Sequence, residues 1–291
     1  MRSRDTVDVV IERAPLEDEL GDVLEKALRA AGLTENELAL RADIPADRIA
    51  DAIDYRAEFT VAELGRMAEA LNLQPAGLAA VASGRYPLPE IAGLPCCLYP
   101  LRMPHGIGVA NAYVVADCSR DTGVLFDTGT DGETLRRLWP DQIRRVEAVC
   151  VTHFETEHTG GLAEVKRRWG DIPIFGPGKD PRYPGMISIG DGGQLDLAGF
   201  DVSVCRTPGH SETHNCYVVR RPAAKRAVPL LLSGDLLFAG SVGGAYYCRK
   251  KMVESLRRMI ADLPPATVVA PGHGPLTTLG NERMHNPFLH G

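Results

Sequence analysis

Residues 151–161 constrain this chain more than any other part of its sequence. They read Val-Thr-His-Phe-Glu-Thr-Glu-His-Thr-Gly-Gly and place four ligand-type side chains directly after an apolar run: His153, Glu155, Glu157 and His158. Imidazoles and carboxylates at this density are what a pair of divalent metal ions needs. Three later segments, each after a β-type run, end at further ligand-type residues, namely His210, Asp235 and His273. The fold therefore has to bring the ends of several strands together at one metal centre.

The order and the flanks of these segments resemble the metallo-β-lactamase superfamily, and most closely its glyoxalase II-like hydrolases. The resemblance covers roughly residues 90–291. Beside the ligand segments it rests on Asn111-Ala112-Tyr113, on Leu125-Phe126-Asp127-Thr128-Gly129, and on the tail 274–280 through Asn286-Pro287-Phe288. It implies an α+β chain in which an αββα sandwich, two sheets with helices outside, follows a small all-α domain.

The resemblance also implies how the ligands divide between two metal ions. By their places in the family motif they form two groups of three and a bridge: His153, Glu155 and His210 for one ion, Glu157, His158 and His273 for the other, and Asp235 between them. Asp235 would also orient the nucleophile, so it is the residue expected to be catalytic.

Two ligand positions depart from the usual family motif, H-x-H-x-D-H. Glu155 adds a carboxylate, which offsets positive charge and should favour harder ions, so we expect two metal ions with iron favoured and zinc or manganese as alternatives. Flavodiiron proteins resemble this chain at Glu155, because they carry H-x-E-x-D-H and two irons. Glu157 is one methylene longer than aspartate, which puts full occupancy of the second site in question. A decayed site, with both glutamates as solvated loop charges, is the alternative interpretation.

Residues 16–82 predict a small helical domain. Two capping-box patterns mark helix starts: Thr34 with Glu37, and Thr60 with Glu63. The run 24–81 resembles the phage-repressor-type helix-turn-helix family. Residues 16–84, however, carry 14 Asp or Glu against 6 Lys or Arg. Because DNA affinity comes largely from Lys and Arg on phosphates, we expect protein contact, such as homodimerisation, rather than DNA binding.

We divide the chain into an extension (1–15) with one strand near 7–11, the helical domain (16–82), a linker rich in Pro and Gly (83–95) and the metal domain (96–291). In the metal domain, short β-type runs predict strands near 97–103, 111–117, 123–127, 148–152, 173–175, 201–205, 215–220, 229–233 and 267–270. Helices are expected near 132–138, 160–169 and 250–262.

Charge, hydropathy and cysteine usage limit which partners and which cellular compartment fit the chain. The net charge of −6 argues against general polyanion binding. No basic-then-apolar segment opens the chain and no apolar run is long enough to span a bilayer, so we expect a cytoplasmic protein without membrane contact. The seven cysteines are odd in number and lack C-x-x-C spacing, which favours reduced thiols, with Cys150 and Cys205 packed beneath the site. Among the other histidines, His105, His285 and His290 are expected in loops or tails. His214 is expected at the surface, and a place behind the metal ligands is the alternative.

Three functions fit these features. The first is a dinuclear metal-dependent hydrolase of a small activated ester or thioester, in which a metal-bridging hydroxide attacks the acyl carbon. Four residues lie where relatives place substrate contacts, although they also fit a helix start: Tyr246, Tyr247, Arg249 and Lys250. The second is a non-haem diiron protein that binds, senses or reduces dioxygen or nitric oxide, and it would need an electron-transfer partner. The third is a ligand- or redox-sensing transcription regulator. The third helix of the helical domain, expected from Pro45, would have to enter the major groove of DNA, and its acidic residues Asp47, Asp51 and Asp54 disfavour this function.

Overall fold

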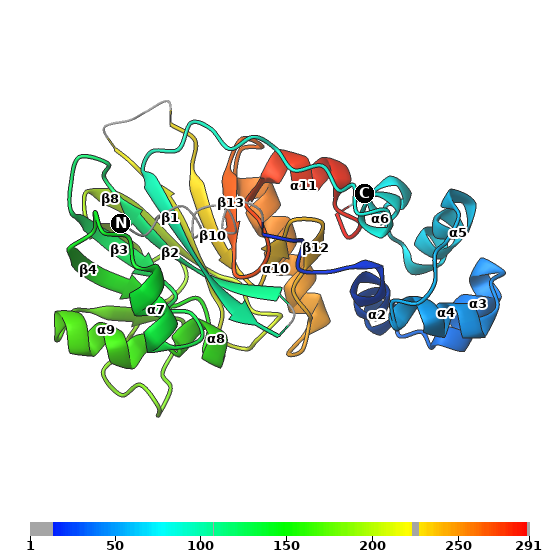
Figure 1. Ribbon diagram of the computed structural model, residues 1–291, viewed down its shortest axis with the longest axis horizontal. Coiled ribbons are helices and arrows are strands. Elements are labelled where there is room, and N and C mark those ends of the chain that lie inside the picture. Colours follow the sequence, from blue (N-terminus) through cyan, green and yellow to red (C-terminus); the bar gives the residue numbers. More distant parts are fainter. Residues whose placement is uncertain (1–13, 107, 223–226, 290–291) are drawn as a thin grey trace, which may run out of the picture.

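The computed structural model describes residues 14–106, 108–222 and 227–289. The strand expected near residues 7–11 therefore lies outside the described residues. Figure 1 shows a layered sandwich of strands and helices on one side and a group of helices on the other. This arrangement confirms the predicted fold class, an αββα sandwich preceded by helices.

Two six-stranded sheets form the middle layers of the sandwich. The first sheet has the order β1-β2-β3-β4-β5-β6, with bounds Cys97–His105, Gly108–Ala116, Thr122–Phe126, Arg145–Cys150, Ile174–Gly176 and Ile187–Ser188. The second has the order β14-β13-β10-β9-β8-β7, with bounds Thr277–Thr278, Val268–Pro271, Leu230–Gly234, Asn215–Arg220, Phe200–Arg206 and Gln194–Leu197. A short ribbon pairs β11 (Leu237–Phe238) with β12 (Ser241–Val242).

Helices cover the outer face of each sheet. Three helices lie between strands of the first sheet along the chain: α7 (Gly132–Leu138), α8 (Thr156–Thr159) and α9 (Leu162–Trp169). Two later helices accompany the second sheet: α10 (Arg249–Asp262) precedes β13, and α11 (Leu279–His285) follows β14. Phe126, Phe200 and Tyr217 fill the core between the sheets, while the outer core on the second sheet includes Met252 and Leu256 of α10. Because both of its faces are covered, β2 is buried along most of its length.

The directions of the strands explain how distant ligand segments meet. β8 and β10 each pair antiparallel with β9, and β10 pairs parallel with β13, so β8, β10 and β13 run the same way. Their carboxyl ends deliver the segments that carry His210, Asp235 and His273 to one edge of the sandwich. β4 of the facing sheet delivers residues 151–161 to the same edge, as predicted.

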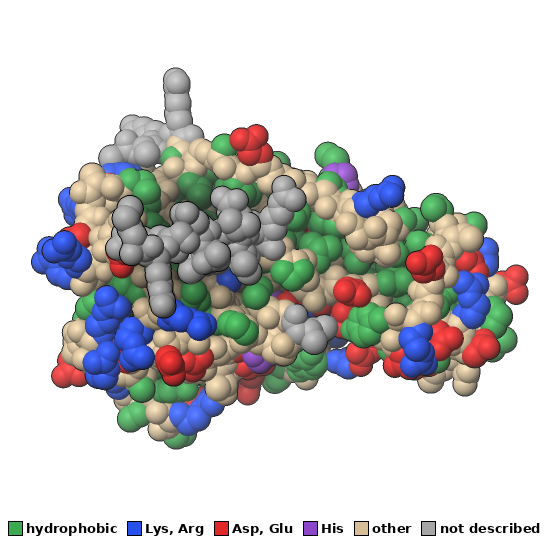
Figure 2. Space-filling view, viewed as in Figure 1, with side chains coloured by type: hydrophobic (Ala, Val, Ile, Leu, Met, Phe, Trp, Pro, Cys, Tyr) green, Lys and Arg blue, Asp and Glu red, His purple; other side chains and the backbone are tan. Residues whose placement is uncertain are grey.

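Within the described residues, five helices precede the sandwich: α2 (Leu20–Ala31), α3 (Glu35–Ala42), α4 (Ala46–Ile53), α5 (Val61–Leu71) and α6 (Pro75–Ala82). Both predicted capping boxes are present, at Thr34 and Thr60. A shared core that includes Leu24, Leu38 and Met67 holds the helices together. Figure 2 shows acidic side chains spread over the visible face of this helical region, with basic ones only between them. The domain boundaries and the helix-turn-helix assignment remain predictions.

One expectation about the cysteines is wrong. Cys97 and Cys118 form a disulfide, because the antiparallel register of β1 and β2 places Cys97 opposite Ala116 and brings Cys118 within reach. Disulfides persist mainly in oxidising compartments, and the cytoplasmic location remains a prediction. Cys150 is buried under the site as expected, and Cys205 is half-buried. Among the described helices, none has the length and apolar character needed to cross a membrane.

Candidate metal centre

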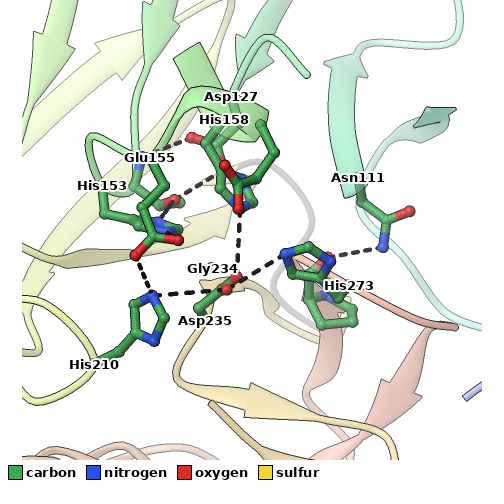
Figure 3. A network of polar contacts seen from close by, with 12 residues as sticks. Asn111, Asp127, His153, Glu155, His158, His210, Gly234, Asp235 and His273 are labelled. Carbon is green, nitrogen blue, oxygen red and sulfur yellow. Dashed lines mark hydrogen bonds and ion pairs between the residues drawn. The ribbon is translucent and has the colours of Figure 1, made fainter. Parts of the chain in front are cut away.

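Two groups of side chains converge at the edge where the strands end (Figure 3). The first contains His153, Glu155, His210 and Asp235, and the second contains His158, Asp235 and His273; in each group the candidate ligand atoms lie within 4.8 Å of one another. Asp235 belongs to both groups. Its Oδ1 lies 3.5 Å from His158 Nε2, and its Oδ2 lies 3.4 Å from His273 Nε2 and 3.8 Å from His210 Nε2.

The donor atoms at this centre fit a pair of metal ions. Within the described part of the chain, His153 Nε2, His158 Nε2 and Asp235 Oδ1 are buried and make no hydrogen bond. A buried polar atom without a partner costs about 1–3 kcal/mol, so three of them facing one small space need another explanation. Imidazole nitrogens and carboxylate oxygens that converge in this way are suited to iron, manganese or zinc.

The four histidines share a second feature, since each ring is fixed through its Nδ1 atom. His158 Nδ1 lies 3.1 Å from Asp127 Oδ2, and His153 Nδ1 lies 2.9 Å from Thr152 Oγ1. His210 and His273 each hold Nδ1 at 3.0 Å from a backbone carbonyl, that of Gly244 and that of Val109 respectively. Such contacts select the ring tautomer, and they leave Nε2 directed into the centre as a ligand atom.

Charges at the centre perturb one another strongly. Burial acts to raise the pKa of Asp235, but the nearby His273 and His158 rings outweigh it and hold the pKa far below its ordinary value. Burial likewise acts to lower the pKa of His273, yet the Asp235 carboxylate raises it to about 9. The nearby His153 and His210 rings lower the pKa of Glu155. Asp235 and Glu155 are therefore carboxylate anions beside positively charged groups. Metal ions bound at the centre would take the place of the protons that supply this positive charge.

Two glycines make room for the shared aspartate. A Cβ atom on Gly272 would lie 2.1 Å from Asp235 Oδ1, and one on Gly234 would lie 2.7 Å from His214 Nε2. Gly234 also has a φ of 48°, a conformation that glycine adopts at least cost. Any larger residue at either position would push the Asp235 carboxylate or its neighbours out of place.

Two residues at this centre were not predicted in these roles. Asp127 is buried after β3 and accepts hydrogen bonds from the Thr152 amide at 2.7 Å and the Thr152 hydroxyl at 2.8 Å, beside its contact with His158. His214 was expected at the surface, which is wrong: it is fully buried, its Nδ1 lies 2.8 Å from Thr207 Oγ1, and its Nε2 accepts from the Asp235 amide at 3.1 Å. Burial holds the pKa of His214 well below its ordinary value, so the ring stays neutral and can accept.

The sequence did carry a signal for both residues. Asp127 ends an apolar strand run directly before Thr-Gly, and His214 stands between a ligand loop and the apolar β9. Polar residues at such places are buried with the strand, and a buried polar group needs a partner.

Glu157 departs from the expected ligand set, since it lies outside both groups. Its Oε1 is 3.5 Å from Nε2 of His105, which ends β1 rather than lying in a loop. Glu155 is the N-cap of α8, and Glu157 and His158 are consecutive residues of that helix. Consecutive helical residues do not share a face, so when His158 points into the centre Glu157 points away from it.

The four residues predicted to contact substrate have different surroundings in the structure. The ring of Tyr246 packs edge-on against His210, with the ring centroids 5.4 Å apart. Tyr247 bonds through its hydroxyl to Glu212 Oε1 at 3.4 Å. Arg249 is the first residue of α10, and Lys250 is highly exposed and lies 4.0 Å from Glu254. Tyr246 therefore contacts His210 through its ring and Tyr247 through its backbone amide, 3.1 Å from the His210 carbonyl, and the substrate roles of all four residues remain predictions.

Comparison with known proteins gives consistent results. Residues 105–273 match the family described as "Metallo-beta-lactamase superfamily". A "Probable metallo-hydrolase YqgX" of Bacillus subtilis (strain 168) is 30% identical over 213 residues, which cover 65% of this chain and 97% of that protein. A "Hydroxyacylglutathione hydrolase" of Pectobacterium atrosepticum is 32% identical over 164 residues, covering 56% of this chain and 61% of that one. The crystal structure of TTHA1623 in a di-iron-bound form superposes with a TM-score of 0.51 at 33% identity, over 65% of this chain and 99% of that chain.

Proposed function

The chain belongs to the metallo-β-lactamase superfamily, and from that premise we propose that it is a dinuclear metal-dependent hydrolase of small activated esters or thioesters. The observation that carries the proposal is the shared Asp235, which lies between two groups of candidate ligands. Similarity to proteins named metallo-hydrolase and hydroxyacylglutathione hydrolase supports the reaction class.

We assign the ions to the two groups of residues that converge. His153, Glu155 and His210 would hold one ion, His158 and His273 would hold the other, and Asp235 would contact both. Ions bound there would supply Lewis acidity, which activates water at neutral pH and stabilises negative charge on an acyl oxygen. Glu157 keeps no part in this assignment, since it faces His105 instead.

The residues around the ions give the reaction its geometry. Water adds to the acyl carbon, the carbon–sulfur bond of the thioester breaks, and one proton passes to the departing thiolate. The Asp235 carboxylate, whose pKa is held low, stays anionic and orients the attacking water as a hydrogen-bond acceptor. Neutral His214 fixes the Asp235 backbone, and the ring of Tyr246 packs against His210.

Glu155 should set the range of substrates. Its carboxylate, at a position where the family usually has histidine, lowers the effective charge of the ion beside it and hence that ion's power to polarise an acyl group. We therefore expect slow turnover of unactivated esters and faster turnover of thioesters that have good leaving groups.

A panel of thioesters and lactones tests the proposal. The metal-replete protein is compared with Asp235→Ala and with Glu155→His, and product is measured as free thiol or free acid. We expect thioester turnover well above the Asp235→Ala background. Turnover at that background for every substrate would overturn the hydrolase assignment.

A second function has one specific observation in its favour. Glu155 Oε1 lies 3.0 Å from His210 Nε2, so a carboxylate occupies the first group where the family usually has histidine. Together with the similarity to a protein solved in a di-iron-bound form, this favours a diiron centre that binds, senses or reduces dioxygen or nitric oxide. A change in the optical spectrum of the reduced protein on exposure to either gas, without hydrolysis, would select this function.

A further inference from the structure

Helix α2 of the helical region lies against the rim of the metal centre at two places. On one side, Glu17 just before the helix has its carboxylate 3.5 Å from His273 Nδ1. On the other side, the Arg29 guanidinium lies 5.5 Å from the ring centroid of Tyr246, which itself packs on His210. The helix thus reaches candidate ligands of both groups, through Glu17 at His273 and through Tyr246 at His210.

Buried polar contacts fix α2 in this position. Asp18 is buried and accepts hydrogen bonds from the Lys26 ammonium and from the Ser241 hydroxyl. Lys26 also donates to the Val242 carbonyl at 2.9 Å. The Lys26 ammonium lies 5.3 Å from the ring of Phe238, which packs on His273. Moving α2 off the rim would break the hydrogen bonds from the Ser241 hydroxyl to Asp18 and from Lys26 to the Val242 carbonyl, and the loss of buried hydrogen bonds is destabilising.

Arg29 and Lys26 differ in how far their charged groups are available to bind a ligand. Lys26 is mostly buried and already paired, so it serves the anchoring of the helix. Arg29 is half exposed, and its one ion pair joins it to Glu25 at 3.0 Å, with Glu25 more than half exposed as well. An exposed pair of this kind is worth little, so a ligand can replace Glu25 at small cost.

The contact with Tyr246 orients the Arg29 side chain for binding. A guanidinium that lies over an aromatic ring keeps the N–H groups along its edge free. A carboxylate matches that edge because two parallel hydrogen bonds can form at once. Tyr246 is 66% exposed, so its ring is accessible to a substrate that extends from the metal centre toward Arg29.

We propose that Arg29 binds a carboxylate on the part of the substrate that does not react, which makes α2 a specificity-determining wall of the metal centre. The inference rests on the proposed hydrolase function and names its substrate class: acyl thioesters or esters that carry a carboxylate at one end. The relatives that match over nearly their whole length align with about 65% of this chain. The remaining third of the chain is long enough to contain the helical region, which would then be an addition beside the matched part.

Three small thioesters test the assignment. The thioester of acetate with 2-mercaptoethanol is neutral, that of acetate with 3-mercaptopropionate has its carboxylate on the thiol half, and that of succinate with 2-mercaptoethanol has it on the acyl half. We expect the protein to prefer one of the two charged substrates by roughly tenfold in kcat/KM, the size of a hydrogen-bonded charge pair. Arg29→Gln should abolish the preference, because it should lower kcat/KM for the preferred charged substrate about tenfold more than for the neutral one.

Two further variants separate recognition from structure. Arg29→Lys keeps the charge without the planar edge and should retain part of the preference. Arg56→Gln is the matched control, because Arg56 is exposed and pairs with Asp51 and Asp54 inside the helical region. If Arg29 only supported Tyr246, Arg29→Gln would lower all three rates together, and that result would overturn the inference.

The outcomes also separate this inference from the proposed function. Hydrolysis of all three substrates without a preference, or a preference that survives Arg29→Gln, would refute the role of Arg29 and leave the hydrolase standing. If no substrate is hydrolysed, the proposed hydrolase function is wrong, and the role of Arg29 is then tested by measuring ligand binding. Calorimetry would compare 3-(methylthio)propionate with 2-(methylthio)ethanol, and the carboxylate should bind more tightly in the wild type but not in Arg29→Gln. Equal binding would overturn the assignment.

Discussion

Replacing Asp127 by asparagine tests whether the metal centre depends on how its histidines are held. The Asp127 carboxylate accepts three hydrogen bonds, from the amide and hydroxyl of Thr152 and from His158 Nδ1. Asparagine has the same shape but one accepting oxygen, and its NH2 group would face a donor. The His158 ring would lose the anionic partner that fixes its tautomer.

The size of the effect follows from the role of such contacts in metal sites. Loss of a partner that orients a ligating histidine typically costs 10- to 100-fold in metal affinity, or about 1.4–2.7 kcal/mol. The loss should fall on the group that contains His158 and His273, while the group around His153 and His210 keeps most of its affinity.

The assay is a competition titration with a chromophoric zinc chelator, which resolves a tight and a weak site. Asp131→Asn is the matched control, since Asp131 caps α7 through the Thr134 amide and asparagine caps a helix equally well. Two unchanged affinities in Asp127→Asn would refute the argument that Asp127 acts through His158.

Three other predictions concern the metal and the helical region. Asp235→Ala should remove most of the bound metal in elemental analysis, because both candidate groups share that residue; unchanged stoichiometry would contradict a dinuclear centre. Protein from iron-replete cells should contain more iron than zinc, and Glu155→His should shift occupancy toward zinc, whereas about two zinc per chain from the outset would exclude the iron preference. Gel-shift titration should give no nanomolar, salt-sensitive DNA binding, since acidic residues outnumber basic ones over residues 16–84.

Local signals in the sequence predicted the longer elements well. The helix expected at 132–138 is found at those residues, because Asp131 caps its first turn and Leu135 anchors its buried face. The strand expected at 215–220 is also found there, in a run of apolar residues that both sides of the sheet bury. Several short elements were missed, among them β6, β11 and β14, since two residues are too few to display a period.

The centre itself was only partly predictable, and Glu157 shows why. Ligand-type residues at close spacing were read as ligands, and the structure brings His153, Glu155 and His158 into the two groups but not Glu157. Glu157 and His158 differ because of where α8 begins, since the first residue of the helix decides which of its side chains point toward the centre. His214 and Asp127 were missed for the related reason that their roles depend on partners distant in sequence, such as the Asp235 amide.

The contacts between the helical region and the sandwich indicate which function the helices have. Glu282 of α11 is fully buried and accepts hydrogen bonds from the Tyr86 hydroxyl at 2.8 Å, the Gly240 amide at 3.0 Å and the Asn286 side chain at 2.8 Å. Tyr86 comes from the segment expected to be a linker, and it packs over Gly240. This segment is therefore fastened to the sandwich, and separating the two parts would cost a buried carboxylate one of its donors. A DNA-reading module gains from freedom to reorient, whereas a wall of a substrate pocket has to stay in place. The buried contacts of Glu282 at one end of the helical region and of Asp18 at the other favour the second role.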